Sequence, residues 1–281
     1  MQDKICLITG ATAGIGKATA HGLAKTGATL VITGRNRDKA AATVAELKAA
    51  SNNQKIEFLI ADLSSQAEVR RLADEFKQKH DRLDVLVNNA GGVFVKRQTT
   101  VDGLEYTFAF NHLAPFLLTN LLLEPLKAAA PARVVTVSSA AEQTGKIDFD
   151  DLQSEKRYGS FRAYSSSKLE NILFSNELAK RLEGTGVTSN ALHPGFVASD
   201  FGKNNPGLMS FAIGLLRPFA INVEKGAATS IYLASSPEVE GVSGKFFTKS
   251  AQANPSNPIA RDGTIAYKLW EVSKELTGLS A

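Results

Sequence analysis

Short runs of apolar, largely β-branched residues alternate along the chain with longer stretches whose apolar positions recur at helical spacing. The predicted strands cover 4–10, 28–34, 55–63, 83–91, 132–139, 187–195 and 244–248. The predicted helices cover about 14–26, 38–50, 65–80, 103–129, the segment around Tyr164, 224–235 and 261–276. Unbroken strand–helix alternation with apolar strands is typical of a parallel sheet, because right-handed crossovers place helices on both of its faces. We therefore expect an α/β fold with a doubly wound parallel sheet flanked by helices.

The order of elements gives no sign of a boundary between domains. We find no internal repeat and no linker of low complexity, so we expect a single domain over residues 1–281. A looser segment over about 198–223 contains the apolar stretch "MSFAIGLLRPFAI" (209–221), which Arg217 and Pro218 interrupt. That stretch is too short to cross a bilayer. We interpret 198–223 as a substrate lid, with a surface helix that touches lipid and buried core as the alternatives.

Composition and charge are those of an ordinary globular protein, with 43% hydrophobic and 21% charged residues. The net charge is +4, but the basic residues are dispersed among acidic ones, so no nucleic-acid surface is expected. Cys6 is the only cysteine, which excludes an intramolecular disulfide and fits a reducing compartment. The four histidines show no ligand spacing, so we expect no metal site. The start, "MQDKICLITG", reads neither as a secretory signal nor as a membrane span, and we expect a cytoplasmic protein.

The first predicted strand runs into "TGATAGIG", where Gly10, Gly14 and Gly16 precede a predicted helix. Glycines allow a tight turn and let a pyrophosphate approach the helix N-terminus, whose free N–H groups attract anions. A glycine-rich turn can also serve any strand–helix junction. The position of this turn after the first strand favours the phosphate site.

The second predicted strand ends in "ITGRN", with Gly34 and Arg35 and no acidic residue. Dinucleotide-binding folds commonly place an acidic side chain there to hold the ribose hydroxyls. An arginine suits a 2′-phosphate instead, because its planar guanidinium matches phosphate oxygens. The alternative is a solvated surface arginine. The pattern favours NADP(H) over NAD(H).

In "AYSSSK", Tyr164 and Lys168 lie four residues apart on a predicted helix. This spacing brings both side chains to one face of the helix. A tyrosine titrates near about 10, and a close cation favours its phenolate, so such a tyrosine could exchange a proton with a substrate oxygen. The same spacing occurs by chance on the wet side of many helices. The rest of the chain must decide between the two.

Several further motifs stand in a fixed order along the chain. After "TGATAGIG" come "ADL" (61–63), "NNAG" (88–91), "FNHLAPFLLT" around Asn111, "VVTVSSAA", "AYSSSK" and "HPGFV". With these motifs the chain resembles the short-chain dehydrogenase/reductase family over nearly its whole length. Through "FNHL", "IDFDDLQSEKRY" and "KLWEVSKEL" it is most similar to the retinol dehydrogenase and WW-domain oxidoreductase branch.

The resemblance implies a Rossmann-type fold, NADP(H) as cofactor and a role for each matching residue. It implies Tyr164 as general acid and base, and Lys168 as the group that lowers the pKa of the phenol and holds the ribose. It implies that Ser139 hydrogen-bonds the substrate oxygen and that Asn111 supports a water-linked proton relay. The choice of Ser139 over the adjacent Ser138 rests on the resemblance alone. The residues implied along the cofactor are Gly10, Thr12, Gly14, Ile15, Gly16, Arg35, Asp62, Leu63, Asn88, Ala90, Gly91, Tyr164, Lys168, Pro194, Gly195, Val197 and Ser199.

Pro115 departs from the branch pattern inside the fourth predicted helix. Proline has no N–H, so the carbonyl of Asn111, four residues earlier, loses its helical partner. We expect a local kink there and a water on that carbonyl, with a tolerated bend far from chemistry as the alternative.

The leading interpretation is an NADP(H)-dependent oxidoreductase that interconverts a carbonyl and an alcohol, with a lipophilic aldehyde or ketone as substrate. A regulatory protein that binds NADP(H) without turnover is the first alternative, against which Ser139, Tyr164 and Lys168 count. A sugar-nucleotide epimerase is the second, but that branch spaces its glycines differently. Pairing of two copies through the long helices stays open.

Overall fold

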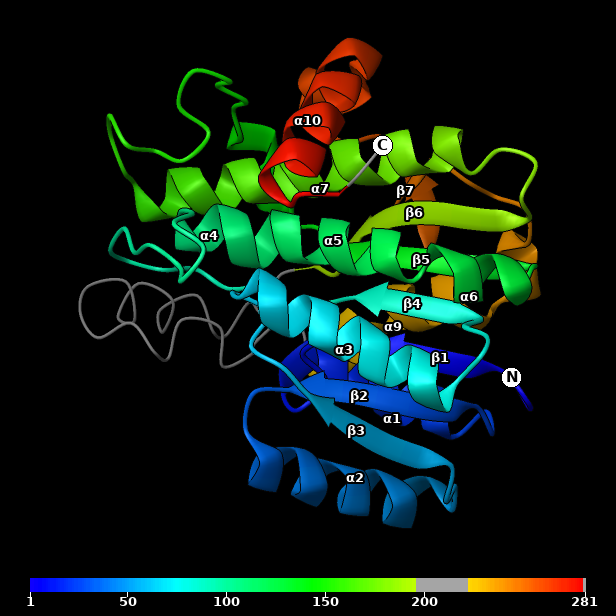
Figure 1. Cartoon of the computed structure of the whole chain (residues 1–281). Helices are drawn as coiled ribbons and strands as arrows, with labels where there is room; N and C mark the ends of the chain where they lie inside the picture. The colour runs from blue at the N-terminus through cyan, green and yellow to red at the C-terminus, as the bar shows by residue number, and fades with distance from the viewer. Residues whose placement is uncertain (196–221, 280–281) are drawn as a thin grey trace.

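An eight-stranded sheet forms the centre of the computed structural model, which describes residues 1–195 and 222–279 (Figure 1). Its strand order is β3-β2-β1-β4-β5-β6-β7-β8, and every neighbouring pair is parallel except β7 and β8. The strands are β1 (Ile5–Ile8), β2 (Thr29–Gly34), β3 (Ile56–Ile60), β4 (Val85–Asn88), β5 (Ala132–Val137), β6 (Val187–His193), β7 (Phe246–Thr248) and β8 (Ala251–Ala253). The order reverses between β1 and β4, so the predicted doubly wound fold is confirmed.

Helices cover both faces of this sheet. They are α1 (Gly14–Ala24), α2 (Arg37–Ser51), α3 (Gln66–Lys79), α4 (Tyr106–Phe108), α5 (Ala114–Leu121), α6 (Leu123–Ala128), α7 (Ser160–Arg181), α9 (Val223–Ser235) and α10 (Gly263–Leu276). A π-helical turn (Ala109–Leu113) separates α4 from α5, and short 3-10 turns lie at Ala140–Thr144, Pro237–Val239 and Pro258–Arg261.

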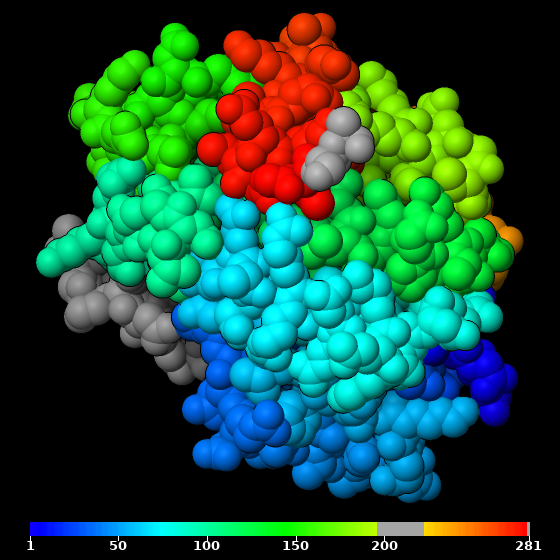
Figure 2. All heavy atoms as spheres, in the orientation of Figure 1, coloured from blue at the N-terminus to red at the C-terminus, as the bar shows by residue number. Residues whose placement is uncertain are grey.

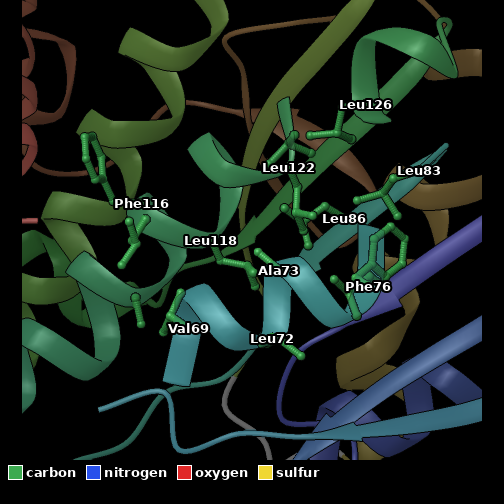
Figure 3. Packing of buried hydrophobic residues seen from close by; sticks show 14 of the residues in the cluster. Val69, Leu72, Ala73, Phe76, Leu83, Leu86, Phe116, Leu118, Leu122 and Leu126 are labelled. Carbon is green, nitrogen blue, oxygen red and sulfur yellow. The ribbon is translucent and has the colours of Figure 1, made fainter. Parts of the chain in front are cut away.

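The core follows from the alternation of side chains along the strands. Leu7, Leu86 and Val134 point to one face and pack with α3, α5 and α7, whereas their neighbours Ile8 and Val135 pack with α1 and α9 on the other. Figure 3 shows the first layer, where side chains of α3 meet those of α5 and α6; its labelled residues are Val69, Leu72, Ala73, Phe76, Leu83, Leu86, Phe116, Leu118, Leu122 and Leu126. Because the strands carry apolar side chains on both faces, the sheet packs against one helical layer on each side.

The C-terminal helix α10 packs on the outer side of α7 and α5. The ring of Trp270 lies 4.8 Å from Phe116 and stacks on Phe174 at 6.0 Å, measured between ring centres. The guanidinium of Arg181 sits 4.4 Å from the centre of the Trp270 ring and bonds Glu271 at 3.0 Å. In Figure 2, α10 (red) is seated among the green segments that contain α5 and α7.

The prediction of one long helix over 103–129 is wrong. The chain forms the short α4, then a π turn in which the N–H of Ala114 bonds the carbonyl of Ala109, five residues earlier. Pro115 follows directly and cannot donate to the carbonyl of Asn111. The π turn lies where the sequence predicted a local kink, and both the kink and the water on that carbonyl stay predictions. A second interruption at Leu122 (φ −106°, ψ 12°) separates α5 from α6, which contains Pro125.

The predicted last strand continues into a hairpin that the sequence pattern did not reveal. After β7, Lys249 and Ser250 take positive φ angles of 50° and 58°, and β8 returns antiparallel. No helix in the described part of the chain is long and apolar enough to span a bilayer. Across 1–195 and 222–279, no three His, Cys, Asp or Glu side chains gather as a metal site.

Candidate active site

The ends of β1 to β6 bring most of the predicted site residues to one edge of the sheet, on the left in Figure 1. Gly10 follows β1, Arg35 follows β2, Asp62 follows β3, Asn88 ends β4 and Ser139 follows β5. In open α/β sheets, ligands bind outside the carboxyl ends of the strands, where the strand order reverses. Here that point lies between β1 and β4, so the glycine turn and the "NNAG" segment lie side by side.

The glycine turn is closely packed and its helix end is open to an anion. Gly10 has φ +64°, and a Cβ there would lie 3.0 Å from the Cα of Ala90. A Cβ on Gly16 would lie 2.5 Å from the Gly10 carbonyl oxygen. Ala13, at the N-cap of α1, has no side-chain oxygen to accept the first N–H groups of the helix. Backbone close approach together with free N–H groups fits a pyrophosphate, so this turn suits a dinucleotide.

Asn89, which the sequence reasoning did not single out, fixes the turn against β4. Its side-chain amide donates to the Thr9 carbonyl at 2.8 Å and to the Gly10 carbonyl at 3.2 Å. The Thr9 hydroxyl accepts from the backbone N–H groups of Asn89 and Ala90, each at 3.0 Å. The signal was present in the polar residues of "NNAG" directly after an apolar strand, but only the fold shows which backbone groups they meet.

The other predicted residues on this side lie along the same edge. The Asn88 side chain donates to the Thr119 hydroxyl at 2.9 Å, and its buried Oδ1 has no hydrogen-bond partner among residues 1–195 and 222–279. Asp62 accepts from the N–H and hydroxyl of Ser64, and Leu63 is buried in the core. A Cβ on Gly91 would lie 3.1 Å from the Lys168 ammonium, so the absent side chain leaves room beside this lysine. The Thr12 methyl group would meet a Cβ on Gly34.

Arg35 is exposed at the end of β2, next to the N-terminus of α2. Its Nη1 donates to the Tyr106 hydroxyl at 3.4 Å, and that phenol comes from α4. Asn36 caps α2 by accepting from Lys39 N at 2.8 Å. The guanidinium keeps further N–H donors for a ligand, because arginine has five. A cationic fork at a helix N-terminus fits a phosphate group.

The phenol of Tyr164 meets the hydroxyl of Ser139. Tyr164 is only 8% exposed, and its burial raises the pKa of the phenol to about 12, while the side-chain hydrogen bond with Ser139 lowers it. The sequence had suggested a phenol pKa below the ordinary value. That expectation is wrong for the protein by itself, because desolvation of the phenolate outweighs the favourable contacts.

The structure separates the roles of the two adjacent serines. Ser138 is buried, and its hydroxyl donates to the Lys168 carbonyl at 2.7 Å, so it fastens the end of β5 to α7. Ser139 begins the 3-10 turn that follows, and its hydroxyl accepts from Ala141 N at 3.2 Å. Ser139, which is half-buried, is therefore the serine that hydrogen-bonds the phenol, and its contact with a substrate oxygen stays a prediction.

Lys168 lies beside Tyr164 on one face of α7, as their spacing predicted. Its ammonium sits 5.6 Å from the centre of the Tyr164 ring and donates to the Val137 carbonyl at 3.1 Å. Lys168 is 3% exposed, and burial lowers the pKa of its amine to about 8. The amine still carries a proton over most of the neutral range, so the site holds a positive charge beneath the phenol.

Asn111 joins this group from the π turn. It is fully buried and exchanges two hydrogen bonds with Gly92, accepting from its N–H at 2.8 Å and donating to its carbonyl at 2.9 Å. Its amide also donates to the Ser167 hydroxyl at 2.9 Å, one residue before Lys168. Asn111 thus links the loop after β4 to α7, the helix that carries Tyr164 and Lys168.

The segment after β6 is described only in part. Pro194 and Gly195 continue from the end of β6, and Gly195 has φ +90°, which favours glycine. Val197, Ser199 and nearly all of the predicted lid lie outside the described residues. His193, which sequence reasoning passed over, accepts from Ala140 N at 3.1 Å and so holds the turn that begins with Ser139.

Comparison with known families now adds to this geometry. The model of the short chain dehydrogenase family matches residues 4–207. The chain belongs to the short-chain dehydrogenase family. As a member it is an oxidoreductase, and the predicted family is confirmed.

Curated members of this family resemble the chain along nearly its whole length. Human retinol dehydrogenase 12 is 44% identical, and the match covers 99% of this chain and 88% of that protein. Human retinol dehydrogenase 13 is 40% identical, with 100% of this chain and 86% of that protein covered. The predicted likeness to the retinol dehydrogenase branch is therefore confirmed.

Solved structures agree with the family assignment. A crystal structure of an uncharacterized protein from Mycobacterium paratuberculosis matches with a TM-score of 0.79 and 34% identity, over 99% of this chain and 94% of that one. The Pseudomonas aeruginosa RhlG/NADP active-site complex matches with a TM-score of 0.70 and 30% identity, over 88% of this chain and 94% of that one. This short-chain dehydrogenase thus shares its fold with an NADP-bound member.

Proposed function

We propose that this short-chain dehydrogenase interconverts a lipophilic carbonyl compound and its alcohol with NADP(H). The observation that carries the proposal is the meeting of Ser139, Tyr164 and Lys168 at the sheet edge that also holds the glycine turn. The bound nicotinamide would supply the hydride to the carbonyl carbon in reduction and accept it in oxidation.

The protein's own groups would manage the proton and the charge on the substrate oxygen. In reduction, Tyr164 donates its phenolic proton to that oxygen, and the Ser139 hydroxyl hydrogen-bonds it. Two donors at one oxygen stabilise the negative charge that develops there. In its buried position the phenol has a pKa of about 12, so its phenolate is unfavourable. The neighbouring Lys168 ammonium would stabilise the phenolate that is left after the proton has been donated. Asn111 would hold the water through which this proton is replaced.

Arg35 supports the preference for NADP(H). It directly follows β2, where the motif "ITGRN" has no acidic residue at the strand end, and it stands at the capped N-terminus of α2. The match to the NADP complex points the same way. We expect Arg35→Ala to lower kcat/KM for NADPH at least tenfold and to change kcat/KM for NADH less than threefold. Lys25→Ala, which removes an exposed charge at the far end of α1, is the matched control.

The lipophilic substrate is supported by the retinol dehydrogenases among the relatives and by the apolar sequence of 209–221. NADPH consumption with a panel of aldehydes and ketones, from short aliphatic compounds to retinal, would measure the preference. We expect the largest kcat/KM with long apolar carbonyls. A preference for short polar carbonyls would contradict this part of the proposal.

Tyr164→Phe tests the chemistry itself. Loss of the acid should lower kcat at least about 100-fold, because positioned acids contribute that much. Binding of NADPH, followed by its fluorescence, should remain within a few-fold of the parent. Activity of the phenylalanine variant within tenfold of the parent would refute the assignment.

A further inference from the structure

His193 at the end of β6 holds the backbone that presents Ser139. Its Nδ1 accepts from the N–H of Ala140 at 3.1 Å, across 53 positions of sequence. Ala140 is the first residue of the 3-10 turn Ala140–Thr144, and Ser139 is the N-cap of that turn, with extended backbone (φ −159°, ψ 158°). The contact therefore acts on the residue that directly follows the proposed hydrogen-bond donor to the substrate.

Each of the first three N–H groups of this turn has a different acceptor. The N–H of Ala140 donates to His193. The N–H of Ala141 donates to the Ser139 hydroxyl at 3.2 Å, and that of Glu142 donates to the Ser139 carbonyl at 3.1 Å. The first N–H groups of a helical turn need acceptors from outside its regular bonding pattern. Because His193 takes the first one, the Ser139 oxygen stays with Ala141, and its hydroxyl hydrogen is left for another oxygen.

The far end of the turn is fastened by another segment. The buried Glu142 carboxylate accepts from the N–H groups of Ser256 and Asn257 at 2.8 Å and 3.2 Å. The Asn257 side chain donates to the Glu142 carbonyl at 3.0 Å. These bonds fix the turn at Glu142, whereas the bond from His193 fixes the end next to Ser139. The end that presents the hydroxyl therefore depends on β6.

The contact with Ala140 also determines the tautomer of the ring. A backbone N–H can only donate, so Nδ1 must keep its lone pair, and the proton of the neutral imidazole lies on Nε2. His193 is half-buried, and this burial lowers the pKa of the ring, which favours the neutral form. We propose that His193 is a positioning residue, which holds the turn through Nδ1 so that the Ser139 hydroxyl meets the substrate oxygen. This role rests on the proposed function, whereas the tautomer does not.

The tautomer of His193 tests the contact without any turnover. In protein with ¹⁵N-labelled histidine, with the signals of this ring assigned through His193→Asn, we expect the Nε2–H tautomer at neutral pH. An Nδ1–H ring in the parent would overturn the contact, because two donors would then face each other at Ala140.

Two substitutions of His193 separate the role of the acceptor from that of the side-chain volume. Oδ1 of asparagine takes the place of Nδ1, since both atoms are bonded to Cγ, whereas leucine has no acceptor. We expect His193→Leu to lower kcat at least about tenfold with KM within about twofold, and His193→Asn to keep kcat within about threefold of the parent. Asn190→Leu on the same strand is the control. It removes the acceptor of the Lys245 N–H, 3.0 Å away, and should lower stability while kcat stays within about twofold.

The action through Ser139 has a test of its own. In a Ser139→Ala background, His193→Leu should change the remaining kcat less than about twofold, because the hydroxyl that it positions is gone. If His193→Leu keeps parental kcat, or lowers kcat equally in both backgrounds, the positioning role is refuted. A parent without turnover on any carbonyl would refute the proposed function and the positioning role with it, and would leave the tautomer result standing.

Discussion

Replacing Lys168 by methionine should make the protein more stable at neutral pH while it abolishes activity. Burial lowers the pKa of this amine from 10.5 to about 8. At about 1.4 kcal/mol for each pH unit, the native state loses about 3 kcal/mol by keeping the ammonium buried below pH 8. Methionine has a similar length and no charge, but it gives up the hydrogen bond to Val137, which is worth about 1 kcal/mol. We expect a net gain in unfolding free energy of about 2 kcal/mol at pH 7.

The dependence on pH is the sharper part of this prediction. Between about pH 8 and 10.5 the unfolded chain holds the Lys168 proton and the native state has released it, so parental stability rises with pH in this window. The advantage of Lys168→Met should therefore vanish by pH 10.5. Urea unfolding without cofactor, at pH 7 and at pH 10.5, measures it. Lys180→Met, an exposed lysine on the same helix, is the control and should change stability by less than about 0.5 kcal/mol. A methionine variant that is less stable than the parent at pH 7, or an advantage that does not change with pH, would refute the reasoning.

Two further substitutions follow from packing and burial. Gly16→Ala puts a Cβ 2.5 Å from the Gly10 carbonyl oxygen and against the Asn89 amide, so we expect about 1–3 kcal/mol of destabilisation and at least tenfold weaker NADPH binding. Dye-monitored melting measures the stability, and cofactor fluorescence measures the affinity. A variant that binds NADPH with parental affinity would count against the phosphate site. Burial and the nearby Glu105 carboxylate raise the pKa of Glu170, so the unfolded chain releases this proton before the native state does, and parental stability falls as pH rises above about 4.5. Glu170→Gln should remove that loss, and stability curves of parent and variant that run parallel from pH 4 to 8 would show the idea to be wrong.

The sheet and the site edge could be predicted because local patterns determine them. Strands apolar on both faces, such as Cys6–Ile8 and Val85–Val87, have few alternatives to a covered parallel sheet. The turn at Gly10 needs a positive φ, and a glycine at this place in the sequence indicates it. The spacing of Tyr164 and Lys168 predicts a shared helix face, and α7 provides it.

Other features depend on contacts between distant segments and left no local pattern. The hairpin of β7 and β8 turns at Lys249 and Ser250, whose positive φ angles usually call for glycine or asparagine. The link from His193 to Ala140 joins residues 53 positions apart. The pKa of Tyr164 depends on how deeply the surrounding helices bury it, which spacing alone does not report.

The packing of α10 has a consequence for how the chain comes off the ribosome. The aromatic side of α5 and α7, with Phe116 and Phe174, is completed by Trp270, which is translated long after both helices. Until α10 is synthesised, the aromatic surface of α5 and α7 therefore stays exposed on the nascent chain. A chaperone or another nascent chain can bind to this surface. Slow translation between α9 and α10 would lengthen that exposure and lower the yield of native protein.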